Sequence, residues 1–382
     1  MRMWKYITGS PKIQPIGMDI GHSSLKMVQL AIYEDGIKIL AARRAPLEVG
    51  WAAGDQEREQ AVIVAARRLL ADNPFRGRHV VSALPIDKIK ITSLRLSEAE
   101  APLADKILRK EAGERFGLDP QKDTINYIHA GNVRQGDDAR DEYILFGADR
   151  ETIGNHIRVL EEAGLTPVGI DAPPCALFRS FERTMRRQED RERTIIFIDV
   201  GCRLTTVVFG RSGEICFVKQ IPVGLGQFTG EIASSLGISV ADAESLRLRL
   251  QRDEPVDAAT RRPMVDALNV MAEQLASEIS LCLRYYTVTF RGKRVERAIV
   301  AGGGAYEQVL RDVLRRHLSV EVEIVEPLRG FDRRHGSIDE RYGDGFADLA
   351  LAVGLSLKGW DSASSDGVEM DRLEPALEGE PL

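Results

Sequence analysis

The stretch Ile16-Gly17-Met18-Asp19-Ile20-Gly21-His22-Ser23-Ser24 has a second version later in the chain, Ile196-Phe197-Ile198-Asp199-Val200-Gly201-Cys202-Arg203. Each version is an apolar run followed by Asp, an apolar residue and Gly. Short runs rich in Ile and Val favour buried strands, and Gly suits a tight turn. A lone Asp-x-Gly is common in ordinary hairpin turns, so neither version decides the fold by itself. Together they predict two strand–turn–strand units whose first strands end near Asp19 and Asp199.

A glycine turn adds a third element. Residues 297–301 form an apolar run that leads into Gly302, Gly303 and Gly304, and a helical pattern follows. A strand, a glycine turn and a helix start form a place where a flat or anionic ligand group can touch backbone. In this order the three elements resemble the first phosphate loop, the second phosphate loop and the adenosine motif of the actin-like ATPase superfamily. The resemblance implies an α/β protein with the actin-like ATPase fold, built from duplicated ribonuclease-H-like domains.

The same resemblance implies an ATP site with Mg²⁺. Asp19 and Asp199 would hold Mg²⁺ through its waters, because Mg²⁺ keeps most of its hydration shell in proteins. The residues expected to contact the nucleotide are Gly21, His22, Ser23, Ser24 and Lys26 in the first turn, Gly201, Cys202 and Arg203 in the second, Glu244 and Arg247 near the base, and Gly302, Gly303, Gly304 and Ala305 in the glycine turn. Lys26 has an alternative interpretation as a solvent-facing strand lysine. Glu244 and Arg247 share a helix face at i and i+3. This pattern is weak evidence by itself and supports a site only because it lies between the second turn and the glycine turn.

Hydrolysis is a separate question from binding. Phosphoryl transfer also needs a residue that positions the attacking water. Actin-like ATPases commonly take this residue from the segment before the second phosphate loop, which is Asp171-Ala172-Pro173-Pro174-Cys175-Ala176 here. Asp171 is the only candidate in it, with a structural role as the alternative. We therefore expect ATP binding, with weak or absent hydrolysis.

Composition excludes several other classes of protein. The chain has 382 residues, 43% hydrophobic and 29% charged, which is typical of a soluble globular protein with two or three domains. Its formal net charge of −6 argues against nucleic acid as the main partner. The four cysteines show no C-x-x-C spacing, and the six histidines form no metal-ligand pattern. With no apolar stretch of bilayer length and no signal peptide, we expect a cytoplasmic protein.

The pattern of elements predicts the domain boundaries. We expect a first actin-like domain over residues 16–85 and 146–190, interrupted by a small α+β insert over residues 86–145. The second actin-like domain is expected over residues 191–357, with residues 226–294 as its helical subdomain. The last apolar helix of that range, over residues 347–357, has an alternative place against the first domain. Residues 1–15 and the acidic segment 361–382 are expected to be flexible.

The whole pattern also resembles one family within the superfamily, the type IV pilus assembly proteins PilM. The segments that carry this resemblance are residues 17–26, 163–171, 221–224, 241–244 and 300–305. The insert also falls where PilM and the division protein FtsA carry an extra subdomain. The resemblance implies a scaffold that binds ATP, recruits the cytoplasmic tail of a PilN-like membrane protein and lies peripheral to the inner membrane. A pilus or a related type II secretion platform, and a homo-oligomer, are compatible with it.

The chain departs from the family pattern at a few positions. Asp171-Ala172-Pro173 stands where the family often has Asp-x-Glu, which argues against hydrolysis, and Arg247 stands where Lys is common. His22 and Cys202 replace smaller residues. Two alternatives remain: an enzyme of the same fold, such as a sugar kinase or an ATP-driven chaperone, and an FtsA-like division protein. A kinase needs a catalytic base and a sugar cleft that no segment indicates, and FtsA needs an amphipathic C-terminal anchor that residues 361–382 do not provide.

Overall fold

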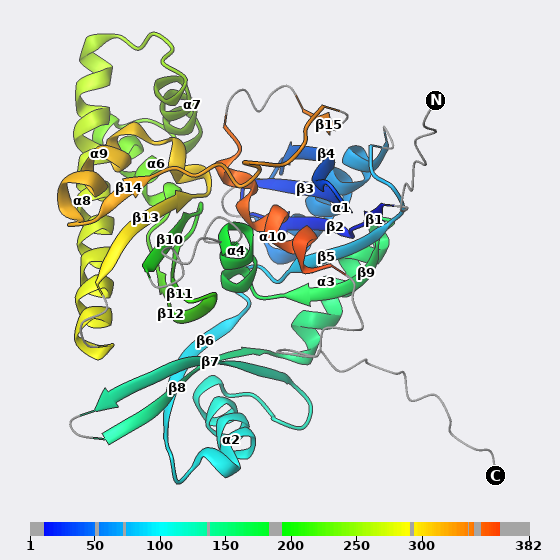
Figure 1. Ribbon diagram of the computed structural model, residues 1–382. Helices are drawn as coiled ribbons and strands as arrows, with labels where there is room; N and C mark the ends of the chain where they lie inside the picture. Colours follow the sequence, from blue (N-terminus) through cyan, green and yellow to red (C-terminus); the bar gives the residue numbers. More distant parts are fainter. Residues whose placement is uncertain are drawn as a thin grey trace, which may run out of the picture.

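Two domains lie side by side, each built on one large sheet, and a small third unit lies below them in Figure 1. The computed structural model describes residues 11–49, 53–71, 74–135, 138–182, 193–290, 294–334, 336–339 and 345–359. The predicted flexible segments 1–10 and 361–382 lie outside the described residues. Residues 11–15 differ from the prediction, since Lys12 and Ile13 form a short strand paired with the sheet.

The first sheet has the order β15-β4-β3-β2-β5-β9, with β1 paired to β3. Its strands are β1 (Lys12–Ile13), β2 (Ile16–Ile20), β3 (Ser24–Tyr33), β4 (Gly36–Pro46), β5 (His79–Ala83), β9 (Thr166–Asp171) and β15 (Ser337–Ile338). The pairs β2–β3 and β3–β4 are antiparallel, whereas β2–β5 and β5–β9 are parallel. The first predicted strand–turn–strand unit is therefore β2 and β3.

The second sheet repeats this topology with the order β12-β11-β10-β13-β14. Its strands are β10 (Thr194–Val200), β11 (Thr205–Arg211), β12 (Glu214–Ile221), β13 (Val295–Ala301) and β14 (Glu321–Glu323). The pairs β10–β11 and β11–β12 are antiparallel, and β10–β13 and β13–β14 are parallel. In both sheets the central strand carries the Asp of the repeated motif, so the predicted duplication is present at the level of strand order.

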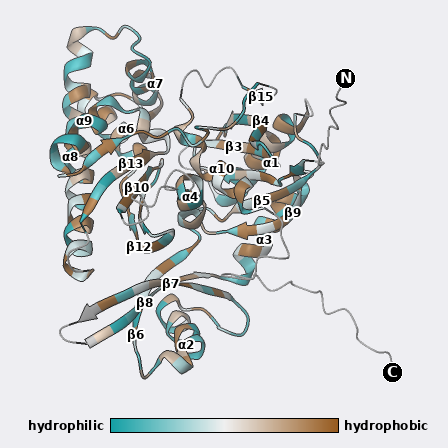
Figure 2. Ribbon diagram, in the orientation of Figure 1, coloured by the Kyte–Doolittle hydropathy of each residue, from teal (hydrophilic) through white to brown (hydrophobic). Residues whose placement is uncertain are grey.

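Helices cover the two sheets and separate them. The helices are α1 (Asp55–Ala71), α3 (Arg150–Glu162), α4 (Pro173–Glu182), α6 (Leu225–Leu236), α7 (Val240–Gln251), α8 (Ala258–Thr289), α9 (Gln308–His317) and α10 (Ala350–Lys358), with 3₁₀ turns η3 (Gly303–Tyr306) and η5 (Ala347–Leu349). Hydrophobic and hydrophilic residues alternate along α8 in Figure 2. The buried face of α8 includes Leu268, Leu275 and Ile279, which belong to the hydrophobic core of the second domain.

The insert is a separate small sheet with one helix across it. Its strands β6 (Lys90–Ser97), β8 (Asp138–Ala148) and β7 (Thr124–Gln135) lie in that order, and the chain also forms η1 (Ala101–Leu103) and α2 (Ala104–Phe116). A cluster that includes Leu96, Leu108 and Leu145 fills the space under α2. The elements agree with the predicted α+β insert, and β8 continues three residues beyond residue 145, where the insert was expected to end.

The end of the described chain returns to the first domain. Helix α10 packs on β2 and on α4, and β15 pairs with β4. The Ser356 hydroxyl donates to the Pro15 carbonyl over 2.9 Å, which fixes α10 beside the start of the first sheet. Helix α4 packs against the second sheet, where the Phe181 and Phe197 rings stack with centroids 5.7 Å apart. The last helix of the range predicted for the second domain, 191–357, therefore takes its alternative place, against the first sheet.

Candidate functional site

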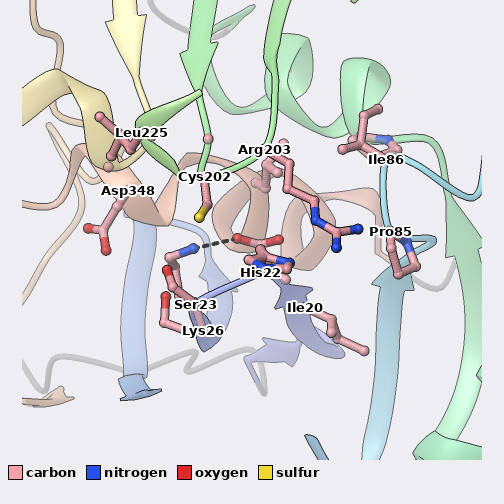
Figure 3. A pocket seen from close by; sticks show the side chains of 18 of the residues that line it. Ile20, His22, Ser23, Lys26, Pro85, Ile86, Cys202, Arg203, Leu225 and Asp348 are labelled. Carbon is pink, nitrogen blue, oxygen red and sulfur yellow. Dashed lines mark hydrogen bonds and ion pairs between the residues drawn. The ribbon is translucent and has the colours of Figure 1, made fainter. Parts of the chain in front are cut away.

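A deep cleft of about 980 Å³ lies between the two domains. Figure 3 shows it from close by, with side chains from the first domain below and from the second domain above. All residues predicted to contact the nucleotide line it except Gly304 and Ala305, and Asp19 and Asp199 line it as well. The structure therefore brings together residues that are far apart in the sequence.

The two repeated turns have the same backbone geometry. The Gly21 amide donates to the Ser24 carbonyl over 3.1 Å, and the Gly201 amide donates to the Leu204 carbonyl over the same distance. A Cβ at Gly21 would lie 2.8 Å from the Ser24 carbonyl oxygen, which is too close for any other residue without a backbone shift. The glycine therefore allows a closed turn, as the sequence predicts.

Asp19 and Lys26 form an ion pair at the base of the first turn. Lys26 Nζ lies 2.9 Å from Asp19 Oδ2, and the two side chains are only 13% and 11% exposed. This pair appears as the dashed line in Figure 3. Burial alone favours the neutral amine, but Asp19 and Asp348 outweigh it and raise the pKa of Lys26. Lys26 is therefore a charged cleft residue, and the alternative of a solvent-facing lysine is wrong.

Asp199 occupies the equivalent position on β10. Burial and the nearby Asp19 carboxylate raise the pKa of Asp199 to about 7, and Lys26 opposes this rise. Two carboxylates that repel each other across a cleft favour a cation between them or a proton on one of them. The pair of carboxylates is therefore the part of the cleft best suited to a hydrated divalent cation.

The second turn is fixed to the start of α6. The Leu225 and Gly226 amides donate to the Gly201 and Cys202 carbonyls over 2.9 and 2.7 Å. A Cβ on Gly224 would lie 2.6 Å from the Cys202 carbonyl oxygen. These contacts hold the second turn close to the helix, so its position is set by backbone rather than by mobile side chains.

The glycine turn lies directly against the second aspartate. Gly302 has φ of 77°, and a Cβ there would lie 2.4 Å from Asp199 Oδ1. Its amide donates to the Ala347 carbonyl over 3.1 Å. Gly302 and Gly303 line the cleft, whereas Gly304 and Ala305 are buried behind it against Val200 and its neighbours. The turn thus offers bare backbone to a flat group through its first two glycines.

The predicted base-contacting pair takes two different roles. Glu244 and Arg247 both line the cleft, but Arg247 is only 5% exposed. Its guanidinium forms an ion pair with Glu307 and donates through Nε to Thr229 Oγ1 over 3.1 Å. Burial raises the pKa of Glu307, although Arg247 opposes this. Arg247 thus has a structural role in the wall of the cleft, and Glu244 is the one of the two that is more available to a ligand.

Asp171 does not line the cleft. Its carboxylate lies 2.8 Å from Arg179 Nη1 and 3.4 Å from Lys358 Nζ, and it also accepts the Ala172 amide. Burial works against ionisation, but the two cations prevail and lower the pKa of Asp171. Its contacts therefore favour the structural alternative, in which Asp171 ties β9 to α4 and α10.

Four further residues of the cleft have no counterpart in the sequence prediction. Arg44 pairs with Asp348 over 3.2 Å, and the Tyr306 hydroxyl donates to the same carboxylate over 3.1 Å. Arg58, on α1, donates to the His22 carbonyl over 3.0 Å. Of these four residues, the sequence pattern could have indicated only Asp348, which is a single acid beside the apolar run 349–357. The others depend on long-range contacts, which no local pattern records.

Metal clusters and membrane-spanning helices are two other features considered for the described residues of this protein. Their His, Cys, Asp and Glu side chains form no group of three or more that could hold a metal ion. Among the helices that the structure describes, none is long and apolar enough to cross a bilayer.

Known structures resemble this chain over nearly its whole length. A chain of the PilM-PilN type IV pilus biogenesis complex matches with a TM-score of 0.72 at 21% identity, covering 92% of this chain and 100% of that one. The ethanolamine utilization protein EutJ from Carboxydothermus hydrogenoformans matches with a TM-score of 0.52 at 14% identity, covering 94% of each chain. With the duplicated strand order, these likenesses confirm the predicted actin-like fold. A family model described as type IV pilus assembly protein PilM matches residues 17–360. Because that model spans most of the sequence, the protein belongs to the PilM family of type IV pilus assembly proteins.

Proposed function

We propose that this protein is an ATP-binding scaffold of a type IV pilus assembly platform, cytoplasmic and peripheral to the inner membrane. Its nucleotide would lie in the cleft between the domains, with Mg²⁺ held through water by Asp19 and Asp199. The observation that carries this proposal is the convergence of both closed turns and the Gly302 turn on one cleft.

The residues of the cleft fit a nucleotide with its cation. The amides near Gly21 and Gly201 and the Ser23 hydroxyl are donors suited to phosphate oxygens. The Asp19 and Asp199 carboxylates suit a hydrated Mg²⁺. Gly302 and Gly303 line the cleft without side chains, so their bare backbone would lie beside the adenosine. When bound, Mg²⁺ would neutralise part of the phosphate charge.

Binding without rapid hydrolysis is the expected behaviour. The one residue expected to position an attacking water, Asp171, is held by Arg179 and Lys358 away from the cleft. Phosphoryl transfer depends on such positioning as well as on a phosphate cradle and a cation. We therefore propose that the nucleotide stabilises a shape of the protein for its partners. A kinase of the same fold is the alternative, and the match to the PilM family favours the scaffold.

The proposed partner is the cytoplasmic tail of a PilN-like membrane protein. The structural neighbour described above is a PilM-PilN complex, and this chain belongs to the PilM family. We expect the tail to dock on the first domain beside the insert. Partners captured from solubilised membranes would also show whether the assembly contains several copies of this chain.

Nucleotide binding is tested by isothermal titration of the full chain with ATP and Mg²⁺. Asp19→Asn removes the charge that pairs with Lys26, and Gly303→Val places a side chain where the adenosine would lie. Both substitutions are expected to weaken binding by about a hundredfold or more, because the first removes a carboxylate charge that would hold the cation and the second fills space that the adenosine needs. Asp35→Asn is the matched control, since Asp35 also pairs with a lysine, Lys38, at 3.4 Å.

The control should bind ATP like the unaltered protein. Circular dichroism of each variant would verify that its fold is retained. Unchanged affinity in both Asp19→Asn and Gly303→Val would refute the site assignment. For the scaffold role, the protein is used to capture partners from detergent-solubilised membranes, and recovery of no pilus or secretion component would count against it.

A further inference from the structure

Two arginines approach the first phosphate turn from opposite domains. Arg58 belongs to α1 of the first domain, and its Nη2 donates to the His22 carbonyl over 3.0 Å. Arg203 belongs to the second turn, and its Nη1 lies 2.9 Å from Asp87 Oδ2. Both side chains line the cleft. In Figure 3 the Arg203 guanidinium lies between His22 and Pro85, over the first turn.

The electrostatics around His22 indicate a positive region. Burial, Arg58 and Arg203 together lower the pKa of His22 to about 4, so its imidazole is neutral at pH 7. Burial and Arg203 likewise lower the pKa of Arg58. Two guanidinium groups that line the same partly buried cleft form a place for an anion.

The nearby acids leave this positive region only partly balanced. Asp55 is held by Lys88 over 2.7 Å, so its charge is already matched. Asp87 pairs with Arg203, but the two side chains are 39% and 49% exposed. An ion pair that exposed is weak and is easily replaced by a stronger anion. The ion pair between Asp87 and Arg203 is therefore weak, and a ligand anion can replace Asp87 as the partner of Arg203.

We propose that Arg58 and Arg203 bind the terminal phosphate of a nucleoside triphosphate, and that Arg203 releases Asp87 to do so. The inference rests on the proposed nucleotide function of the same cleft. A terminal phosphate carries about two negative charges, and an arginine fork can contact two of its oxygens at once. A diphosphate lacks that group, so the arginines would distinguish ATP from ADP.

The change of partner at Arg203 also affects the insert. Asp87 lies between β5, which ends at Ala83, and β6, which begins at Lys90 and opens the insert. Its carboxylate forms an ion pair with Arg203, which belongs to the other domain. When Arg203 turns to the phosphate, the entry to the insert loses this tie to the second domain. Binding of a triphosphate would therefore weaken the attachment of the insert to the second domain.

Titration of the full chain with ATP and with ADP, each with Mg²⁺, tests the inference. Arg203→Gln and Arg58→Gln are expected to weaken ATP binding about tenfold or more while changing ADP binding less than about threefold, since only ATP brings the terminal phosphate. Arg193→Gln is the matched control. Arg193 is also 49% exposed and pairs with a glutamate, Glu296, over 3.1 Å, but it does not line the cleft.

Asp87→Asn tests the exchange itself. Freeing Arg203 from its acid should raise the affinity for ATP severalfold and leave the affinity for ADP unchanged. Equal ATP-to-ADP affinity ratios in Arg203→Gln, Arg58→Gln and Arg193→Gln would overturn the phosphate contact, and an unchanged or lower ATP affinity in Asp87→Asn would overturn the exchange. If the unaltered chain binds neither nucleotide, the proposed function fails as well. If ATP binding depends on Asp19 but not on the arginines, only this inference fails.

Discussion

His156 is a buried imidazole between α3 and β5. It is 7% exposed, and its Nε2 lies 3.2 Å from Ser82 Oγ. Because the Ser82 hydroxyl donates to the Met18 carbonyl over 3.0 Å, the imidazole must be the donor in the contact with serine. Burial lowers the pKa of His156 to about 4. The folded protein therefore keeps this residue neutral across the physiological range.

His156 should make stability depend on pH. The pKa of 6.5 in the unfolded chain exceeds that in the folded chain, so the unfolded state binds more protons between about pH 6.5 and 4. Its contribution to stability is present above this window and is lost as the pH falls. From pH 7.5 to 5.0 the unaltered protein should lose about 2 kcal/mol more unfolding free energy than His156→Gln, as measured by urea denaturation. His79→Gln, at an exposed histidine, should keep the pH sensitivity of the unaltered protein. Equal losses in His156→Gln and the unaltered protein would contradict this.

At this scale the sequence predicted residue types better than partners. The repeated motif identified Asp19, Asp199 and the glycines, because a closed turn restricts which residues fit it. The pairing of Arg247 with Glu307 could not be predicted, since the two are 60 positions apart in the sequence and meet only in the folded chain. Asp171 was assigned from its place in the chain, whereas its cations come from α4 and α10.

At the scale of elements, α10 is the helix that holds the first domain together. It packs tightly on α4, and Gly354 is the point of closest approach. A Cβ there would lie 1.8 Å from the Ala176 carbonyl oxygen, which is backbone and cannot turn aside. The helix is thus fixed by a glycine rather than by a large side chain.

Gly354→Ala should lower the unfolding free energy by at least about 2 kcal/mol, because the added methyl forces α10 away from α4. Gly154→Ala is the control. Gly154 lies within α3, and a Cβ there would meet nothing within 4 Å. This control should instead stabilise the protein by about 0.5–1 kcal/mol through helix propensity. Urea unfolding of both variants provides the measurement, and equal stabilities would contradict the packing argument.

The sequence predicted most elements but not all of their limits. Alternating and helical patterns gave the strands of both sheets, since buried positions repeat with a local period. Local pattern does not place the start of α8, because Pro263 interrupts the helical pattern, whereas the helix begins at Ala258, with the Asp257 carboxylate accepting the Thr260 amide over 3.0 Å. Pro263 is therefore the sixth residue of the helix, and because it has no amide hydrogen, one intrahelical hydrogen bond is missing there. The association of α10 with β2 is a tertiary contact, so the local sequence pattern could not decide to which domain α10 belongs.

At the scale of the whole molecule, the cleft couples the two domains to one ligand. A nucleotide that contacts both turns binds the folded protein and not the unfolded chain. At a free concentration a hundredfold above its dissociation constant, ATP with Mg²⁺ should raise the unfolding free energy by about 2.7 kcal/mol. Calorimetry should show a rise in Tm of a few degrees. Asp19→Asn should show no rise, and an unchanged Tm in the unaltered protein would oppose nucleotide binding in the cleft.

The return of α10 to the first sheet also brings the two ends of the described chain together. Gly359 lies beside Gln14, since a Cβ on Gly359 would be 2.9 Å from the Gln14 side-chain oxygen. A short linker could therefore join these ends, and the chain could be reopened between α4 and β10. In such a circular permutant each domain would be one continuous stretch of polypeptide, which the natural order of the gene does not allow. The two halves of the cleft could then be produced as separate fragments and mixed.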